Sequence, residues 1–366
     1  MNKQNTILSN DLERIYTHLT EIERKKLNDS TILITGCGGF LGYYFVNFFT
    51  KYADELGIQK IIGIDNFIVG CPPWLKEMEC KKKIDLHEFD IITDDISTIE
   101  NVSNVTHVLH MASIASPTFY RAHPIETLDA NVWGLRRLLE YYKSKLLNGF
   151  LFFSSSEIYG NSTPENIPTP EEYNGNVSCI GPRACYDEAK RFGETICYLF
   201  HEKYGTPITV VRPFNNYGPG MRLNDKRVPA DFAKAIFENR DITLLSDGTP
   251  TRTFCYISDA ITGYIKALLY DDFEIFNIGT ETPEISILKL AETYQKIGGE
   301  VFGYTGKITH IVSEDANYLV NNPNRRCPNI GKARSKLSYN PQINVDQGVR
   351  YFLQFIKENR SDELEW

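Results

Sequence analysis

Short apolar runs alternate with longer amphipathic stretches along the first 212 residues of the chain. Runs that predict buried strands, most of them rich in β-branched or aromatic residues, lie at 31–34, 61–64, 83–89, 105–110, 149–154 and 207–212. Apolar residues recur at helical spacing between the runs, at 43–52, 124–146 and 185–204. This alternation predicts an α/β fold with a doubly wound parallel sheet.

The pattern changes after Arg212. Proline, glycine and asparagine crowd residues 213–220, which predicts a turn-rich crossing segment. Beyond it we expect strands at 242–245 and 252–256 and helices at 229–238, 285–297 and 345–357. The chain is therefore expected to form a larger domain over 30–212 with a return segment at about 257–279, and a smaller α/β cap domain over 213–256 and 280–358.

The first 29 residues are predicted to form a helical extension. Leu12, Ile15, Tyr16, Leu19 and Ile22 recur at helical spacing, as on an amphipathic helix that docks on the domain or on a partner subunit. The extension is mostly polar and charged and lacks the apolar core of a signal peptide.

Composition excludes several classes of function. The formal net charge of −8 argues against a nucleic-acid partner, which calls for a basic face. No apolar run is long enough to cross a bilayer, so we expect no membrane association. The eight cysteines form no C-x-x-C pair and no cluster with histidines, which favours reduced thiols in a cytoplasmic protein and no metal site.

A glycine-rich turn follows the first predicted strand. Residues 35–42 read TGCGGFLG and open a predicted helix, the context in which glycines let the backbone approach a pyrophosphate. The second strand ends in Asp65, about 20 residues further on, where a carboxylate binds a ribose. An acid there repels a 2′-phosphate, so NAD is predicted rather than NADP. The alternative is that Asp65 only caps a turn.

Tyr186 and Lys190 are four residues apart and share one face of the predicted helix. An ammonium beside the phenol is expected to lower the tyrosine pKa from about 10 towards a value suited to a base. Glu157, just after a predicted strand, adds a carboxylate for a second proton. In isolation, an exposed lysine beside a packed tyrosine is the simpler interpretation, but the dinucleotide motif favours catalysis.

From about residue 31 to about residue 355 the chain resembles the extended short-chain dehydrogenase/reductases that modify nucleotide sugars. Within them it is most similar to the UDP-glucuronate decarboxylases (UDP-xylose synthases). The resemblance is carried by residues 35–42, 65–67, 110–117, 181–191, 224–228 and 248–254. It implies a Rossmann domain with bound NAD, a nucleotide-sugar substrate and a homodimer formed by the helices at 124–146 and 185–204.

The choice of reaction depends on three residues. Sugar 4,6-dehydratases carry Thr-Asp-Glu where this chain has Ser155, Ser156 and Glu157, and expelling hydroxide needs the proton donor that is missing. The 4-epimerases typically lack the glutamate as well, whereas decarboxylases keep Ser-Glu. The alternatives are a 4-epimerase, a 4,6-dehydratase, or a catalytically idle nucleotide-sugar-binding protein.

The resemblance implies an oxidation followed by decarboxylation. Tyr186 takes the proton of the sugar 4-hydroxyl while hydride passes from C4 to NAD, Lys190 holds Tyr186 in its reactive form, and Ser155 bonds the hydroxyl. The resulting 4-keto acid loses CO2, and the product is UDP-xylose or the 4-keto-pentose, according to whether the hydride returns.

The remaining catalytic roles concern the sugar carboxylate. Ser156 and Glu157 are expected to position it and to handle the C5 proton. Burial against the carboxylate is expected to raise the pKa of Glu157. Arg252 is either a proton donor or a partner of the diphosphate.

Two sets of binding residues are implied. For NAD they are Gly36, Gly39, Phe40, Leu41, Gly42, Asp65, Asn66, Asp90, Ile91, Met111, Ala112, Ser113, Asn131, Tyr186 and Lys190. For the nucleotide sugar they are Ser116, Pro117, Tyr120, Asn215, Arg227, Val228, Arg252, Tyr256 and Arg326. Tyr120 is otherwise a core aromatic, and the arginines are otherwise surface ion pairs.

Two departures from the family pattern fall near the expected ligands. After residues 65–67 the usual Thr-Gly and basic residues are replaced by IVGCPPW at 68–74. The family's Pro-Arg-Met is Pro219-Gly220-Met221 here, with Arg222 one step late. The nucleotide and sugar are therefore open to variation.

Overall fold

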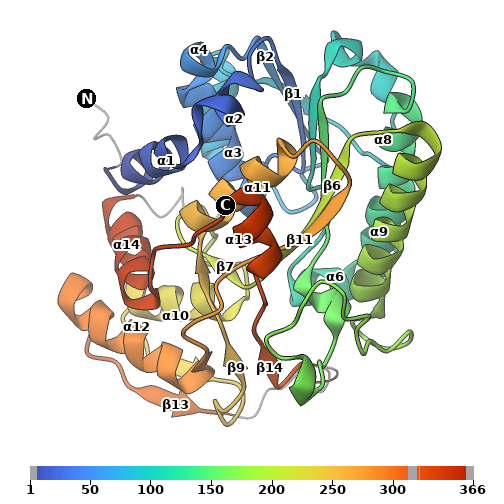
Figure 1. The fold of residues 1–366 in the computed structure, drawn as a ribbon. Coiled ribbons are helices and arrows are strands. Elements are labelled where there is room, and N and C mark those ends of the chain that lie inside the picture. Colours follow the sequence, from blue (N-terminus) through green and yellow to red (C-terminus); the bar gives the residue numbers. More distant parts are fainter. Residues whose placement is uncertain (1–5, 312–319, 321, 360–366) are drawn as a thin grey trace.

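A computed structural model describes residues 6–311, 320 and 322–359. Seven parallel strands form the central sheet in the order β11-β6-β5-β4-β1-β2-β3 (Figure 1). Their bounds are β1 Thr31–Thr35, β2 Lys60–Asp65, β3 Asp85–Glu88, β4 His107–His110, β5 Gly149–Phe153, β6 Ile208–Pro213 and β11 Glu274–Ile278. The prediction of a doubly wound parallel sheet is confirmed.

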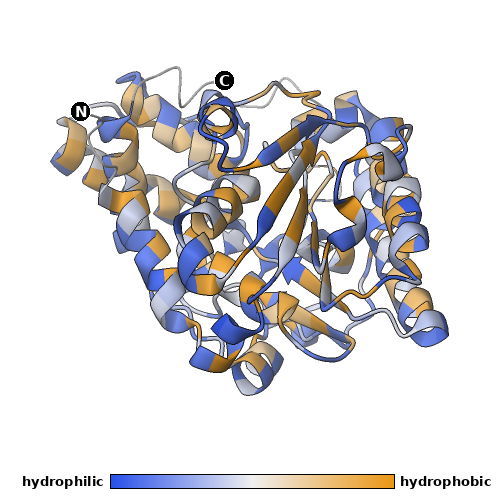
Figure 2. Ribbon diagram, turned by 90° about the horizontal axis from the view of Figure 1, so that it is seen from above, coloured by the Kyte–Doolittle hydropathy of each residue, from blue (hydrophilic) through white to orange (hydrophobic). Residues whose placement is uncertain are grey.

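Alternate residues of each strand pack against different helices. On β1, Ile32 and Ile34 join a core with α3 (Phe40–Lys51) and α11 (Ile257–Leu268). Leu33 joins the opposite core with α8 (Leu135–Tyr142) and α9 (Ala184–Tyr204). Both faces are therefore buried, and Figure 2 shows apolar strands between helices whose outer faces are hydrophilic.

The predicted helix over 124–146 is interrupted. It consists of α7 (Pro124–Asp129), a π-helical turn at Ala130–Gly134 and α8, and it ends at Tyr142. The Asn131 side chain donates to the carbonyl of Thr127 at 2.7 Å, which perturbs the helical hydrogen-bond ladder at the turn.

The smaller elements lie beyond the carboxyl ends of the sheet strands (Figure 1). They comprise α10 Val228–Phe237, α12 Ile287–Phe302, α14 Val345–Glu358, β8 Ile242–Leu244 with β13 Ile308–His310, β7 Asn216–Tyr217 with β10 Cys255–Tyr256, and β12 Ile285–Ser286, β9 Thr251–Arg252 and β14 Arg325–Arg326. The predicted strand at 252–256 is thus two strands in different sheets, and the helix expected from 285 begins at Ile287. The division into two domains stays a prediction.

The shorter helices are α4 Ala53–Leu56, α5 Pro73–Cys80 and α6 Pro117–Ala122. None of the helices in the described ranges is long and apolar enough to span a membrane.

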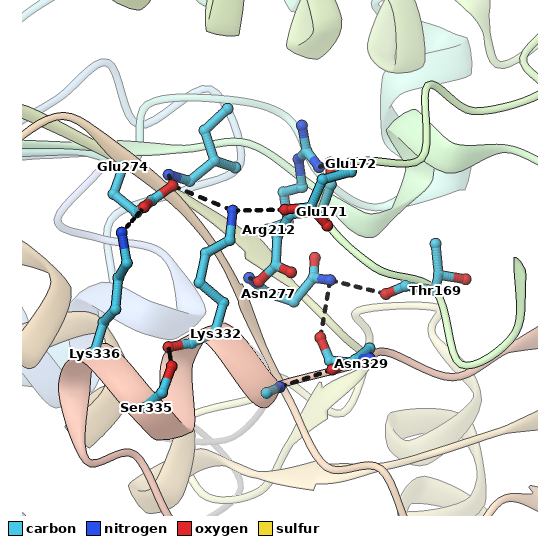
Figure 3. Close-up of polar contacts among 12 residues, drawn as sticks. Thr169, Glu171, Glu172, Arg212, Glu274, Asn277, Asn329, Lys332, Ser335 and Lys336 are labelled. Atoms are coloured by element: carbon cyan, nitrogen blue, oxygen red, sulfur yellow. Dashed lines mark hydrogen bonds and ion pairs between the residues drawn. The ribbon is translucent and has the colours of Figure 1, made fainter.

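A polar network fastens the C-terminal segment to the edge of the sheet (Figure 3). Asn277 of β11 donates its side-chain N–H groups to the carbonyls of Thr169 and Asn329, at 2.9 and 3.1 Å. Lys332 of α13 (Gly331–Leu337) forms ion pairs with Glu172 and Glu274. The network fixes the chain on both sides of residue 330, and so holds the preceding strand β14 beside the sheet.

The N-terminal extension docks on its own chain. It forms α1 (Thr6–His18) and α2 (Glu21–Lys25), and Leu12, Ile15 and Leu19 are buried as expected. Ile22 is 72% exposed, so the apolar pattern does not extend to it. The first helix ends at His18, and the chain restarts as a separate short helix capped by Thr20, which turns Ile22 away.

A buried carboxylate anchors the extension. Asp11 Oδ2 accepts hydrogen bonds from the hydroxyls of Tyr44 on α3 and Tyr256 on β10, at 2.6 and 2.7 Å. Burial raises the pKa of Asp11 to about 6, while the two tyrosines and Arg14 oppose the rise. The extension is thus bonded to both the sheet helices and the cap strands.

The raised pKa of Asp11 predicts a pH-dependent penalty on stability. The Asp11 carboxyl has a pKa of about 3.8 in the unfolded chain and about 6 in the folded chain. Its protonated form therefore stabilises the fold fully below pH 3.8, and this stabilisation is lost as the pH rises through 6. Relative to wild type, Asp11→Asn should gain up to about 3 kcal/mol between pH 4 and pH 7 in urea unfolding. Asp54→Asn, an exposed change, is the control. A constant difference between Asp11→Asn and wild type across this range would contradict the assignment.

Candidate active site

A cleft of about 520 Å³ opens at the carboxyl ends of the sheet strands, where ligands bind in such folds. Its walls come from loops after β1, β2, β4, β5 and β6 and from the cap elements. Among the residues predicted from the sequence it is lined by Gly36, Gly39, Phe40, Leu41, Asp65, Asn66, Asp90, Ile91, Met111, Ala112, Ser113, Ser116, Pro117, Ser155, Ser156, Glu157, Tyr186, Lys190, Asn215, Arg227, Val228, Arg252 and Arg326.

Tyr256 does not reach the cleft. Its side chain is fully buried and its hydroxyl is bonded to Asp11 of the N-terminal extension. This corrects the expectation of a substrate contact, because Tyr256 follows the strand pairing of β10 away from the cleft.

Three further predicted residues lie behind the lining. Gly42 packs helix α3 against the turn, where a Cβ would lie 2.1 Å from the carbonyl oxygen of Cys37. Asn131 donates at 2.9 Å to the hydroxyl of Ser113, which lines the cleft. Tyr120 is buried and its ring stacks on that of Tyr186 with centroids 5.2 Å apart. These three support lining residues.

The glycine turn and Asp65 form one half of the cleft. Gly36 has φ +70°, and a Cβ would lie 2.9 Å from the backbone nitrogen of Ala112, so only glycine fits without strain. Gly38 and Phe67 donate their backbone N–H groups to the two oxygens of Asp65, each at 2.9 Å. The start of α3 has no side-chain cap, which leaves its backbone N–H groups for a phosphate. This donor set fits NAD.

Lys190 and Tyr186 lie side by side at the base of the cleft. Lys190 Nζ donates to the carbonyl of Phe153 at 2.5 Å and lies 5.7 Å from the centre of the Tyr186 ring. Burial lowers the pKa of Lys190 to about 7. Burial also raises the pKa of Tyr186 to about 12, although a hydrogen bond with Ser155 opposes the rise. The expected lowering of the tyrosine pKa is therefore absent, because burial outweighs the hydrogen bond with Ser155 and the charge of Arg227.

Glu157 is held between two arginines. Its Oε2 forms ion pairs with Arg183, just before α9, and with Arg326 of β14. Burial raises the pKa of Glu157, but the two guanidinium groups together lower it well below its usual value. This corrects the expectation of a raised pKa. The adjacent carboxyl of Asp187 takes the opposite shift, because burial and the charge of Glu157 raise its pKa.

Arg252 is the third arginine at this end of the cleft. Its guanidinium is buried and donates to the carbonyls of Thr251, Pro323 and Asn324. Within the described ranges no carboxylate forms an ion pair with it. Burial and repulsion from Arg326 lower the pKa of Arg252 to about 9. A buried cation in this state is stabilised by an anionic ligand.

Sequence reasoning missed Arg183 and Gly38. Arg183 lies inside the motif at 181–191 and three residues before Tyr186, but nothing local indicates that it pairs with Glu157. Gly38 belongs to the glycine turn, and its bond to Asp65 needed the register of β1 with β2.

Comparisons with known proteins agree with this geometry. The profile of the NAD dependent epimerase/dehydratase family matches residues 32–279. UDP-glucuronic acid decarboxylase 5 of Arabidopsis thaliana is 33% identical over 318 residues, which cover 87% of this chain and 86% of the relative. UDP-glucuronic acid decarboxylase 1 of Xenopus tropicalis is 31% identical over 355 residues, covering 95% and 77%.

Among solved structures, the UDP-glucuronic acid 4-epimerase of Bacillus cereus, in complex with UDP-glucuronic acid and NAD, superposes with a TM-score of 0.73. The two sequences are 26% identical, and the alignment covers 90% of this chain and 99% of the epimerase.

The charge balance around Glu157 predicts that its loss destabilises the fold. Because folding lowers the pKa of Glu157, its ionised form stabilises the folded state. This stabilisation is complete above the unfolded pKa of 4.5 and is lost as the pH falls towards 2. Glu157→Gln should therefore lose about 3 kcal/mol of unfolding free energy at pH 7, and less at pH 4. Urea unfolding measures both, with the exposed Glu100→Gln as control. A loss at pH 7 no larger than that of the control would contradict the ion-pair assignment.

Proposed function

The chain belongs to the NAD dependent epimerase/dehydratase family, and from this membership we propose that it decarboxylates UDP-glucuronic acid by way of a 4-keto intermediate. Its product is UDP-xylose or the 4-keto-pentose nucleotide. The observation that carries the proposal is the surplus of positive charge at the Tyr186 end of the cleft. Arg183, Arg252 and Arg326 lie around Glu157 there, and the pKa of Asp187, the second carboxyl beside Arg183, is raised by burial, an arrangement that suits a sugar carboxylate.

The first step is oxidation at C4. NAD, when bound, supplies the hydride acceptor. Tyr186 acts as a phenolate, which Lys190 and the positive charge of oxidised NAD, when bound, would stabilise, and takes the proton of the 4-hydroxyl. Ser155, which hydrogen-bonds Tyr186, orients the same hydroxyl. Lys190 is fixed by the carbonyl of Phe153, so its ammonium stays at the base of the cleft. The new carbonyl is β to the carboxylate.

The second step breaks the C5–C6 bond. The electron pair moves into the C4 carbonyl, CO2 leaves, and a proton returns to C5. Glu157 is ionised between its arginines, so it orders water and the arginines rather than donating the proton itself. Arg252, whose bonds go to backbone carbonyls, holds the sugar carboxylate until the bond breaks.

A 4-epimerase acting on the same substrate is the second candidate, since the structurally similar Bacillus cereus enzyme has that name. A 4,6-dehydratase is disfavoured because Ser156 stands where an acid is needed to expel hydroxide. A nucleotide-sugar-binding protein without activity has no use for the pairing of Tyr186 with Lys190.

Incubation of the purified protein with UDP-glucuronic acid tests the proposal. Mass spectrometry is expected to show a product lighter by CO2, and absorbance of NADH shows whether the keto intermediate is reduced before release. A product of unchanged mass with inverted C4 would establish epimerisation instead. Turnover of either kind excludes the inactive binding protein.

Tyr186→Phe should bind NAD and UDP-glucuronic acid like wild type and lose about 100-fold or more in turnover, because the 4-hydroxyl keeps its proton. The ring keeps its stacking on Tyr120, so folding should be unaffected. Calorimetric binding and product formation measure the two effects. Near wild-type turnover would remove Tyr186 from the proton transfer.

We further propose a homodimer formed by α7 and α9. Ile125 on α7, Trp133 in the π-helical turn and Phe192 and Leu199 on α9 are each more than half exposed, although their helices pack on the sheet. A second copy would cover this apolar face. Trp133→Glu with Phe192→Glu should convert a dimer to a monomer in light scattering. Ile22→Glu, on the N-terminal extension, is the control. A monomeric wild-type protein would overturn the proposal.

A cytoplasmic location is also proposed. All eight cysteines are free thiols, which suits a reducing compartment. Recovery of the protein outside the cytoplasmic fraction of lysed cells would contradict it.

A further inference from the structure

The loop after β2 borders the cofactor half of the cleft without a basic side chain. Residues 66–72 read NFIVGCP, and Asn66, Ile68, Val69 and Gly70 line the cleft. The neighbouring Asp65 is an acid and adds no positive charge to the loop. A dinucleotide diphosphate is an anion, so a cationic side chain near the N–H groups at the start of α3 would strengthen its binding.

Arg222 reaches this loop from the far side of the cleft. Its Nη1 donates to the carbonyl of Val69 at 3.0 Å, and its guanidinium lies 5.7 Å from the centre of the Phe119 ring on α6. Asp65 and Asp225 both act electrostatically on it. Arg222 therefore lines the cleft, contacts the loop after β2 and lies within electrostatic range of Asp65, which is bonded to the glycine turn. A dinucleotide diphosphate binds at such a turn, which places it near this guanidinium.

The packing around Gly220 explains why the cation comes from position 222. Gly220 has φ +83°, and a Cβ would lie 2.5 Å from the ring of Tyr43 on α3. The Tyr43 ring packs edge-on against Trp74 of α5, with centroids 5.0 Å apart. The loop after β2, the first helix of the sheet and the crossing segment thus form one packed unit. A side chain at 220 would collide with Tyr43, and Arg222, two residues further on, is a basic residue that lines the cleft and contacts the loop after β2.

We propose that Arg222 binds the diphosphate of NAD, in place of basic residues in the loop after β2. A guanidinium presents five N–H donors in a planar fork, so it can hold a carbonyl and a phosphate together. The role rests on the NAD dependence of the proposed function. The test of this role measures the affinity for the cofactor and does not depend on turnover of the substrate.

The experiment compares Arg222→Gln with wild type after removal of copurified nucleotide. Calorimetry with NAD, ADP-ribose, adenosine and UDP gives four dissociation constants. Those for NAD and ADP-ribose should rise about 10- to 100-fold in the variant, the range of a charge-assisted hydrogen bond. Those for adenosine and UDP should stay within about twofold, because Arg222 is assigned to neither.

Two further variants serve as controls. Arg222→Lys keeps the charge and loses the fork, so its affinity for NAD should lie between those of wild type and Arg222→Gln. Arg240→Gln removes an exposed arginine that pairs with Glu238 outside the cleft and should bind NAD like wild type. Thermal unfolding establishes that each variant is folded.

Unchanged NAD affinity in Arg222→Gln would overturn the proposal. A loss confined to UDP would do the same, because it would assign Arg222 to the diphosphate of the substrate. If wild type binds NAD but does not decarboxylate UDP-glucuronic acid, the proposed reaction fails while the comparison of NAD affinities still decides the role of Arg222.

Discussion

Charge buried at the carboxyl edge of the sheet is the constraint that the rest of the structure satisfies. Lys190 is 3% exposed and Arg252 is 6% exposed, and neither forms an ion pair in the described ranges. Each is held by backbone carbonyls, which accept hydrogen bonds but leave the charge unbalanced. Unpaired charges cost several kcal/mol in a protein interior, which is why burial lowers the pKa of both side chains. An anionic ligand beside Arg252 would offset this cost.

The C-terminal segment supplies one of the arginines that balance the buried charge of Glu157. Glu157 follows β5, while its partner Arg326 is 169 residues further along the chain. Bonds made by Asn277 and Lys332 hold the backbone just after Arg326 against β11 and the loop at 169–172, as Figure 3 shows. The pinning places β14 beside β9, so that Arg326 and Arg252 enter the cleft together. The cap therefore covers the cleft and also supplies it with the charged side chains of Arg252 and Arg326.

The sequence predicts most of the sheet, because parallel strands are buried on both faces and appear as continuous apolar runs. The glycine turn and the pair of Tyr186 with Lys190 are local patterns, and Gly36, Gly39, Tyr186 and Lys190 line the cleft, while Gly42 lies behind it. Other features depend on distant contacts. The split of 252–256 follows from pairing with β7 and β14, and the low pKa of Glu157 follows from Arg326. Tyr256 is drawn away by Asp11, which no local pattern connects to it.

The charge on Glu157 bears on the choice between decarboxylation and epimerisation. An ionised carboxylate that shares arginines with the sugar carboxylate repels it, and this repulsion disappears when the group leaves as neutral CO2. A 4-epimerase keeps the sugar carboxylate throughout, so it gains nothing from a second anion in the same arginine cluster. Arg183 and Arg326 keep Glu157 ionised, and its neighbour Ser156 cannot act as the acid of a dehydratase. The arrangement therefore favours cleavage of the C5–C6 bond, because only that step removes the repulsion between Glu157 and the sugar carboxylate.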